Sequence, residues 1–354
     1  MRAARVLLSC SLLALALAAC GRTERQRTPE PASAAPVAAD RLAMFTPIPP
    51  AVPAASGAAN EEMIALGRML YYEPRLSKSQ TISCNSCHDL AKYGVDGEVT
   101  SDGHAGKKGD RNSPTVYNAA AHFVQFWDGR AADVEEQAKG PVLNPVEMAM
   151  GGEAAVVAVL ASIPEYVDRF ARAFPGEAKP ISYDNMARAI GAFERRLMTP
   201  SRWDALLAGD ASALIAEEQV GLKTFLDAGC QACHYGALLG GTSYQRLGAV
   251  KAYPGNADPG RFKVTGNEAD RAVFKVPSLR NIDKTAPYFH DGHVADLQDA
   301  VRQMGEYQLG KTLTDAEVQN VVAFLRVLTG KIDEGYIKPP ELPKSTANTP
   351  KPVL

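Results

Sequence analysis

The chain has 354 residues, of which 46% are hydrophobic and 22% are charged, and its formal net charge is −2. This composition is typical of an ordinary globular protein. The charge gives no sign of the clustered basic face that nucleic-acid binding requires, so we expect no nucleic-acid partner.

The first 19 residues predict a secretory signal peptide, because two arginines precede an apolar run over residues 6–19. That run is shorter than a membrane span, which needs about 20 apolar residues. The sequence L-A-A-C-G at residues 17–21 resembles a bacterial lipobox, in which Cys20 becomes the lipidated first residue of the mature protein. Ordinary cleavage before Cys20, without a lipid, is the alternative. We expect a periplasmic protein that meets the membrane only through its N-terminal lipid.

The chain divides by composition into a tether, a folded part and a tail. Residues 20–59 are rich in Pro and Ala and lack periodicity, which predicts a flexible, lipid-anchored tether. The folded part is long enough for two domains. We place them at residues 60–200 and 201–332, because each half then contains one copy of the motif described below. Residues 333–354 are again rich in Pro and predict an irregular tail.

The periodic segments of the folded part are helical. Apolar residues recur at helical spacing from Met186 to Leu197, behind a candidate cap at Ser182. Thr314 and Glu317 form a T-x-x-E capping box in front of another apolar face. Shorter helical patterns cover residues 61–70, 154–160, 218–226 and 297–304. Strand patterns are scarce, and long loops rich in Gly, Asn and Pro fill the gaps, as expected where a large ligand organises the chain.

Two copies of a C-x-x-C-H motif occupy residues 84–88 (C-N-S-C-H) and 230–234 (C-Q-A-C-H). In a c-type haem site the two thiols form thioethers to the haem and the adjacent histidine coordinates iron. One such motif could also be a redox dithiol or half of a zinc site, and four cysteines could form disulfides. Two copies without spare cysteines favour haem attachment. The predicted attachment residues are Cys84, Cys87, His88, Cys230, Cys233 and His234.

These motifs and the helical patterns together predict the fold class. We expect a mainly α protein made of two cytochrome c-like helical domains, each holding one covalent haem, with long irregular loops.

Ordered segments outside the two motifs carry a family resemblance. They are D-G at 96–97, G-H at 103–104, G-D-R-N-S-P-T at 109–115, Q-F-W-D-G-R at 125–130, Q-A-K-G-P at 137–141, N at 144, E-M at 147–148, V-P-S-L-R-N at 276–281, T-A-P-Y-F-H-D-G at 285–292 and Q-L-G at 308–310. With these segments the chain resembles the bacterial di-haem cytochrome c peroxidases over nearly the whole folded part.

The resemblance implies an activity and its catalytic residues. It implies reduction of hydrogen peroxide at the His88 haem, with electrons from a small cytochrome c or cupredoxin entering at the His234 haem. Glu147 would move protons during peroxide cleavage, Gln137 would hold the peroxide by hydrogen bonding, and Trp127 would lie between the haems. A homodimer is implied by the resemblance alone.

The resemblance also implies the remaining axial ligands. His104 matches a histidine that caps the first iron in the resting form and withdraws on activation, although a solvated loop histidine is the alternative. Met304 matches the axial methionine of the second haem, whose thioether would raise its potential. A plain core methionine is the alternative. Tyr307 lies close by, and a related enzyme that matures a tryptophylquinone cofactor uses a tyrosine as this ligand.

A calcium ion is the last cofactor that the resemblance implies. Asn112 and the backbone carbonyls of Thr285 and Pro287 match a calcium site between the domains, with neutral oxygen ligands and waters. His290 is expected near a haem edge, whereas His122 and His293 have no assigned role.

Two other functions compete with peroxide reduction. One is an oxidase that modifies residues of a partner protein, and the other is an electron carrier with two permanently six-coordinate haems. A carrier has no use for Glu147 and Gln137 at an open iron, so the sequence favours the peroxidase.

Overall fold

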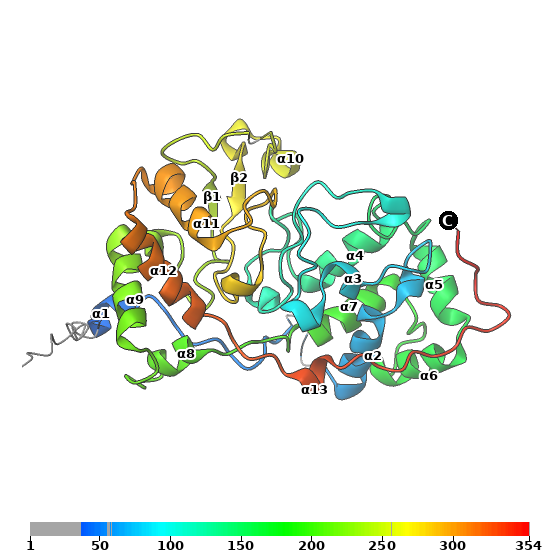
Figure 1. Cartoon of the computed structure of the whole chain (residues 1–354). Coiled ribbons are helices and arrows are strands. Elements are labelled where there is room, and N and C mark those ends of the chain that lie inside the picture. The colour runs from blue at the N-terminus through cyan, green and yellow to red at the C-terminus, as the bar shows by residue number, and fades with distance from the viewer. Residues whose placement is uncertain (1–36, 55–56, 58, 256, 354) are drawn as a thin grey trace, which may run out of the picture. The chain divides into compact units, whose positions relative to one another are not determined.

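The structure is mainly helical, as the sequence predicts (Figure 1). It is a computed structural model, which describes residues 37–54, 57, 59–255 and 257–353. The predicted signal peptide and Cys20 lie outside these residues. The helices predicted from periodicity are all present, and the capping box at Thr314 and Glu317 is formed.

The first half is built around the contact between its first and last long helices. Its helices are α2 (Glu61–Tyr71), α3 (Cys84–Cys87), α4 (Val134–Leu143), α5 (Glu153–Ala161), α6 (Pro164–Ala173) and α7 (Tyr183–Glu194). Helix α2 packs on α7, which also contacts α4. A Cβ atom at Gly67 would lie 1.8 Å from the carbonyl oxygen of Ala189, so glycine is needed where the two backbones approach.

The second half repeats this arrangement with a different pair of helices. Its helices are α8 (Arg202–Leu207), α9 (Ala216–Ala228), α10 (Phe262–Thr265), α11 (Leu297–Gln303) and α12 (Asp315–Val327). Helix α9 packs on α12, and a Cβ atom at Gly221 would lie 2.2 Å from the carbonyl oxygen of Asn320. Strands β1 (Tyr244–Arg246) and β2 (Val273–Lys275) form an antiparallel pair in which Tyr244 faces Lys275.

Short helical turns occupy the loops that join these elements. They are the 3₁₀ turns η1 (Pro74–Leu76), η2 (Leu90–Lys92), η3 (His104–Gly106), η4 (Ala119–Ala121), η5 (Cys230–Ala232), η6 (Glu268–Asp270) and η7 (Ile282–Lys284), and the π-helical segment η8 (Met304–Gln308).

The two ends of the described chain pack crosswise. The N-terminal segment, which leads into the first half, packs on the second half, and the C-terminal segment, which follows the second half, packs on the first. After α1 (Ala39–Leu42), the buried Phe45 packs edge-on against Trp203, with ring centroids 5.3 Å apart. Part of the predicted tether therefore contributes to a core. At the other end, α13 (Glu334–Ile337) brings Tyr336 onto Phe193 of the first half, with centroids 5.0 Å apart. The domain boundary near residue 200 remains a prediction.

A buried polar cluster connects the two halves. Thr199 accepts hydrogen bonds at its hydroxyl from the side chains of Asn118 (2.8 Å) and Asn281 (2.9 Å). The backbone N–H of Thr199 donates to the side-chain oxygen of Asn118 (2.9 Å). All three residues are at most 1% exposed. Because these buried groups satisfy one another, they fix how the chain crosses from one half to the other.

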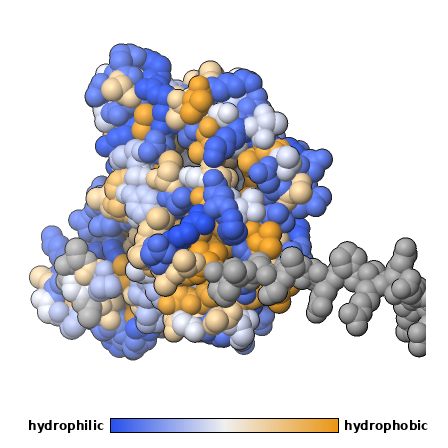
Figure 2. All heavy atoms as spheres, turned by 90° about the vertical axis from the view of Figure 1, so that its left-hand side faces the viewer, coloured by the Kyte–Doolittle hydropathy of each residue, from blue (hydrophilic) through white to orange (hydrophobic). Residues whose placement is uncertain are grey.

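The surface on the α9 side is mainly hydrophilic, with apolar residues gathered in a few patches (Figure 2). None of the helices in the described part of the chain is both long enough and apolar enough to cross a membrane.

Candidate functional site

Each C-x-x-C-H motif lines its own cavity. Cys84, Cys87 and His88 line the first cavity, of about 470 Å³. Residues 230, 233 and 234 line the second, of about 240 Å³. The local geometry is the same in both, because the backbone N–H of the histidine donates to the carbonyl of the first cysteine at 3.0 Å.

The residues of both motifs are in a chemical state that fits haem attachment. The four cysteines of the motifs form no disulfide with one another. Burial raises the pKa of Cys84, and it raises the pKa of Cys230 to about 11. Burial also lowers the pKa of His88 and of His234, which favours the neutral imidazole that binds metal. The Nδ1 of His234 lies 3.0 Å from the carbonyl oxygen of Leu239, so its Nε2 is left for a metal ion.

The predicted peroxide-site residues lie together in the first cavity. Gln137, from α4, and Glu147, from the loop after α4, both line it. The side-chain amide of Asn144 donates to Glu147 Oε1 at 2.6 Å. Burial raises the pKa of Glu147, while the charge of Arg130 and the hydrogen bond from Asn144 act in the opposite direction. This carboxyl group is therefore poised to exchange a proton closer to neutral pH than an exposed glutamate.

A buried glutamate in the first cavity was missed by the sequence analysis. Glu194, at the end of α7, lines this cavity and is 4% exposed. Burial and the charge of Glu135 raise its pKa to about 8, although the charge of Arg195 opposes the shift. The available signal was its position, because Glu194 lies four residues after Ile190 on the apolar face of an amphipathic helix.

Trp127 lies at the boundary of the two cavities and lines both of them. Its indole N–H donates to the carbonyl of Asn112 at 2.9 Å. His290, expected near a haem edge, lines the second cavity, stacks on Phe274 at 4.3 Å and faces the indole edge-on at 6.4 Å.

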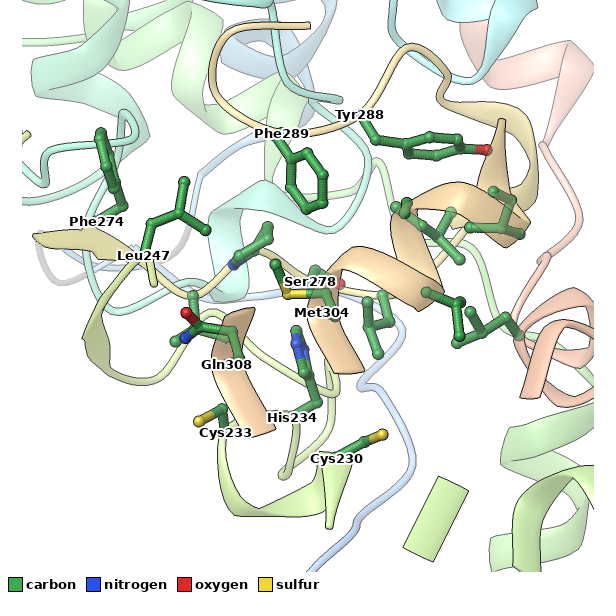
Figure 3. A pocket seen from close by; sticks show the side chains of 18 of the residues that line it. Cys230, Cys233, His234, Leu247, Phe274, Ser278, Tyr288, Phe289, Met304 and Gln308 are labelled. Atoms are coloured by element: carbon green, nitrogen blue, oxygen red, sulfur yellow. The ribbon is translucent and has the colours of Figure 1, made fainter. Parts of the chain in front are cut away.

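Met304 and Tyr307, the two candidate ligands for the second haem, are placed differently. Met304 lines the second cavity, where it and His234 project into the same space (Figure 3). Both candidates belong to η8, and such π-helical segments are frequent at functional sites. Tyr307 does not line the cavity. Its ring packs edge-on against Tyr253 with centroids 5.5 Å apart, and Lys251 lies over its face.

His104 is buried, but it does not line the first cavity. Its backbone N–H donates to the carbonyls of Val146 (3.0 Å) and Glu147 (2.7 Å). A Cβ atom at Gly103 would lie 2.0 Å from the carbonyl oxygen of Val146, so this close contact requires glycine. The loop that carries His104 is therefore packed directly on the segment that carries Glu147.

The three residues expected at the calcium site line the second cavity: Asn112, Thr285 and Pro287. The side-chain amide of Asn112 donates to the carbonyl of Glu98 at 2.9 Å. Within the described residues, no cluster of three or more His, Cys, Asp or Glu side chains could hold a metal ion. The residues expected at this site offer neutral oxygen atoms, which can bind hard cations such as calcium.

Lys275 and His122 also line the second cavity. The sequence analysis gave no role to His122 and did not single out Lys275. A lysine that follows an aromatic residue in a short strand carries no signal of burial, so only the fold reveals this pair.

Comparisons with known proteins agree with this arrangement. Residues 61–212 match the family model of the di-haem cytochrome c peroxidases. The chain is 49% identical over 317 residues to the cytochrome c551 peroxidase of Pseudomonas aeruginosa, covering 88% of this chain and 91% of that protein. It is also 49% identical over 294 residues to the cytochrome c551 peroxidase of Nitrosomonas europaea, covering 82% and 86%. The crystal structure of a MauG-like protein associated with microbial copper homeostasis matches with a TM-score of 0.75 and 31% identity, covering 83% of this chain and 97% of that one.

Proposed function

Because the chain belongs to the di-haem cytochrome c peroxidase family, we propose that it reduces hydrogen peroxide to water with electrons from a small periplasmic cytochrome c or cupredoxin. It is an oxidoreductase with two covalent c-type haems, one at each C-x-x-C-H motif. One observation carries the proposal: Glu147 and Gln137 line the cavity of the first motif, and Trp127 connects this cavity to the second.

The first cavity would reduce the peroxide. When bound, the haem there supplies an iron that can pass electrons to peroxide. Converting one hydrogen peroxide into two water molecules consumes two electrons and two protons. Glu147 would take a proton from one peroxide oxygen and return it to the departing oxygen, while Gln137 would hold the substrate without exchanging protons.

The second cavity would collect the electrons. We propose that Met304, together with His234, would hold the iron of the second haem, because Met304 lines this cavity and Tyr307 does not. A thioether ligand raises the potential of a c-type haem and so favours electron uptake. The placement of Tyr307 against Tyr253 argues against the partner-modifying oxidase. Trp127 would shorten the path between the two haems.

His104 would control access to the first cavity. In the described arrangement Glu147 lines this cavity and His104 does not. A resting form in which His104 binds the iron requires its loop to leave the carbonyls of Val146 and Glu147. The same movement would displace Glu147, so capping by His104 and catalysis by Glu147 exclude each other.

A calcium ion would support this arrangement at the boundary between the cavities. Asn112 contributes to both cavities, and the carbonyls of Thr285 and Pro287 belong to the loop that also carries His290. Neutral oxygen ligands with several waters make a site of modest affinity. Calcium binding would hold the Trp127 segment in place, because the indole donates to the carbonyl of Asn112.

The proposal also includes a cellular location and an assembly state. A periplasmic protein, anchored by a lipid at Cys20, follows from the predicted signal peptide and fits a donor of the cytochrome c type. A homodimer is part of the proposal because of the family resemblance.

Stopped-flow spectroscopy of the holoenzyme tests the proposed function. The half-reduced protein, incubated with calcium, is mixed with hydrogen peroxide in the presence of a reduced cytochrome c. We expect rapid oxidation of two donor molecules per peroxide. A carrier with two six-coordinate haems would consume no peroxide, and that result would contradict the proposal.

Near-infrared spectroscopy of two variants tests the second haem ligand. Met304→Ala should lose the methionine-to-iron charge-transfer band and lower the potential of the second haem. Tyr307→Phe is the matched control and should keep both. Persistence of the band in Met304→Ala would rule out Met304.

A further inference from the structure

Lys275 is buried in an apolar cavity without an acidic partner. It lies at the end of β2 and is 6% exposed. Among the described residues that line the second cavity there is no Asp, Glu or Arg, and Lys275 is the one lysine. A buried ammonium group is costly unless it is paired with a negative charge. The cavity must therefore gain an anion if Lys275 is to stay charged.

Two hydrogen-bond donors, one on Lys275 and one on His122, remain free to bind such an anion. Its Nζ lies 2.8 Å from Nδ1 of His122 and 3.2 Å from the carbonyl oxygen of Val124. An ammonium group has three hydrogens, so one remains without an acceptor among the described residues. Because Nδ1 of His122 accepts from the ammonium, the ring carries its own hydrogen on Nε2, which is buried and also lacks a partner.

The surrounding charges do not supply the missing partner. Burial lowers the pKa of Lys275 to about 7, and Asp128 opposes the shift through its charge alone. Asp128 is itself paired with Arg111 at 2.6 Å and with Arg130 at 3.0 Å. Lys275 is thus a buried amine with no carboxylate among its hydrogen-bond partners, and an anion beside it would favour its charged form.

We propose that Lys275 and His122 bind a propionate carboxylate of the haem attached at Cys230 and Cys233. The thioether links and the two propionates are on opposite sides of haem c, so the propionates face away from the cysteines. Figure 3 shows Phe274 on the far side of the pocket from Cys230 and Cys233, and Lys275, the next residue of β2, lines the same cavity. The spare ammonium hydrogen and the Nε2 hydrogen of His122 provide two donors for one carboxylate.

The pair would also tune the second haem. A positive charge near the haem disfavours ferric iron, which carries one more positive charge than ferrous iron, and therefore raises the potential. Lys275 would in this way assist the axial ligand in making the second haem the electron acceptor. This inference rests on haem attachment at the second motif but not on peroxide chemistry, so it survives if the peroxidase activity is absent.

Two measurements on the holoprotein test the inference without measuring activity. Optical potentiometry gives the midpoint potential of each haem, and resonance Raman spectroscopy gives the propionate bending bands of the second haem. In Lys275→Met we expect a lower potential of the second haem and shifted propionate bands, with the first haem unchanged. Lys275→Arg keeps the charge and should keep the parent values.

The control is Lys223→Met, which removes an exposed lysine from α9 in the same half. It should change neither measurement. If Lys275→Met does not fold with both haems attached, Lys275→Gln carries the test, because its amide fills the site without a charge and should also lower the potential. Parent-like potential and parent-like propionate bands in a folded, uncharged variant would overturn the inference.

Discussion

The two haem cavities share one attachment motif and differ in the charged side chains that line them. Among the described residues, the first cavity is lined by several charged side chains, including Arg130, Glu147 and Glu194, whereas the second has Lys275 alone. Proton transfer requires titratable groups beside the iron, while electron storage requires an apolar site with a thioether ligand. The C-x-x-C-H motif therefore fixes the cofactor, and the surrounding side chains decide its chemistry.

The largest expected effect comes from removing the titratable group that distinguishes the first cavity. Glu147→Gln keeps the shape and the hydrogen bond with Asn144 but cannot accept a proton. Loss of a general acid–base typically lowers the rate by about 10²–10⁴-fold. We expect a fall of this order in peroxide turnover, measured by stopped flow, with the spectrum of the second haem unchanged.

The matched control is Glu165→Gln, which replaces an exposed glutamate of α6 that pairs with Arg169. It should turn over peroxide at the parent rate. Full activity in Glu147→Gln would mean that Glu147 does not supply the protons. The charged lining of the first cavity would then not explain why peroxide reacts there.

The sequence predicted most of the fold, and it failed where tertiary contacts override local signals. The periodic helices and the two haem motifs follow from local pattern. Helix α4 was missed because Gly140 and Pro141 signal a break, yet Pro141 removes only the one bond to the carbonyl of Gln137, and the helix ends two residues later at Leu143. The burial of Phe45 could not be foreseen either, since a Pro-rich segment shows no periodicity.

The candidate site was predicted through its resemblance more than through its physics. Glu147, Gln137 and Trp127 carry no individual local signal, and the family pattern selected them. Glu194 and the pair of Lys275 with His122 were missed, because burial of a charged side chain is set by distant parts of the chain.

The two halves are alike in having one glycine at the closest contact between their main helices. Gly67 and Gly221 each allow two helices to approach closely. Alanine at either position would place Cβ against a backbone carbonyl, and such overpacking costs about 1–3 kcal/mol. We expect Gly67→Ala to destabilise the first half and Gly221→Ala the second, with the larger effect at Gly67, where the contact is shorter. Thermal unfolding followed at the bands of each haem measures both.

Gly151→Ala is the control for these two variants, because a Cβ atom there meets no other atom within 4 Å. It should unfold at the parent temperature. Equal disturbance of both haems by either glycine variant would show that the halves unfold as one unit, which would count against separate domains meeting near residue 200.

The last expected effect is a pH dependence that belongs to the first half alone. Glu194 has a folded-state pKa of about 8, raised by burial and by the charge of Glu135, whereas an unfolded glutamate has a pKa near about 4.3. Between these values the folded protein keeps a proton that the unfolded chain has lost, so stability falls as pH rises through this window. The slope is at most about 1.4 kcal/mol per pH unit.

Glu194→Gln cannot titrate, so its melting temperature should depend less on pH than that of the parent between mildly acidic and mildly alkaline buffer. Glu165→Gln, with its exposed side chain, should keep the parent's slope. An equally steep slope in Glu194→Gln would show that Glu194 is ionised in the folded protein, and the first cavity would then carry one more negative charge.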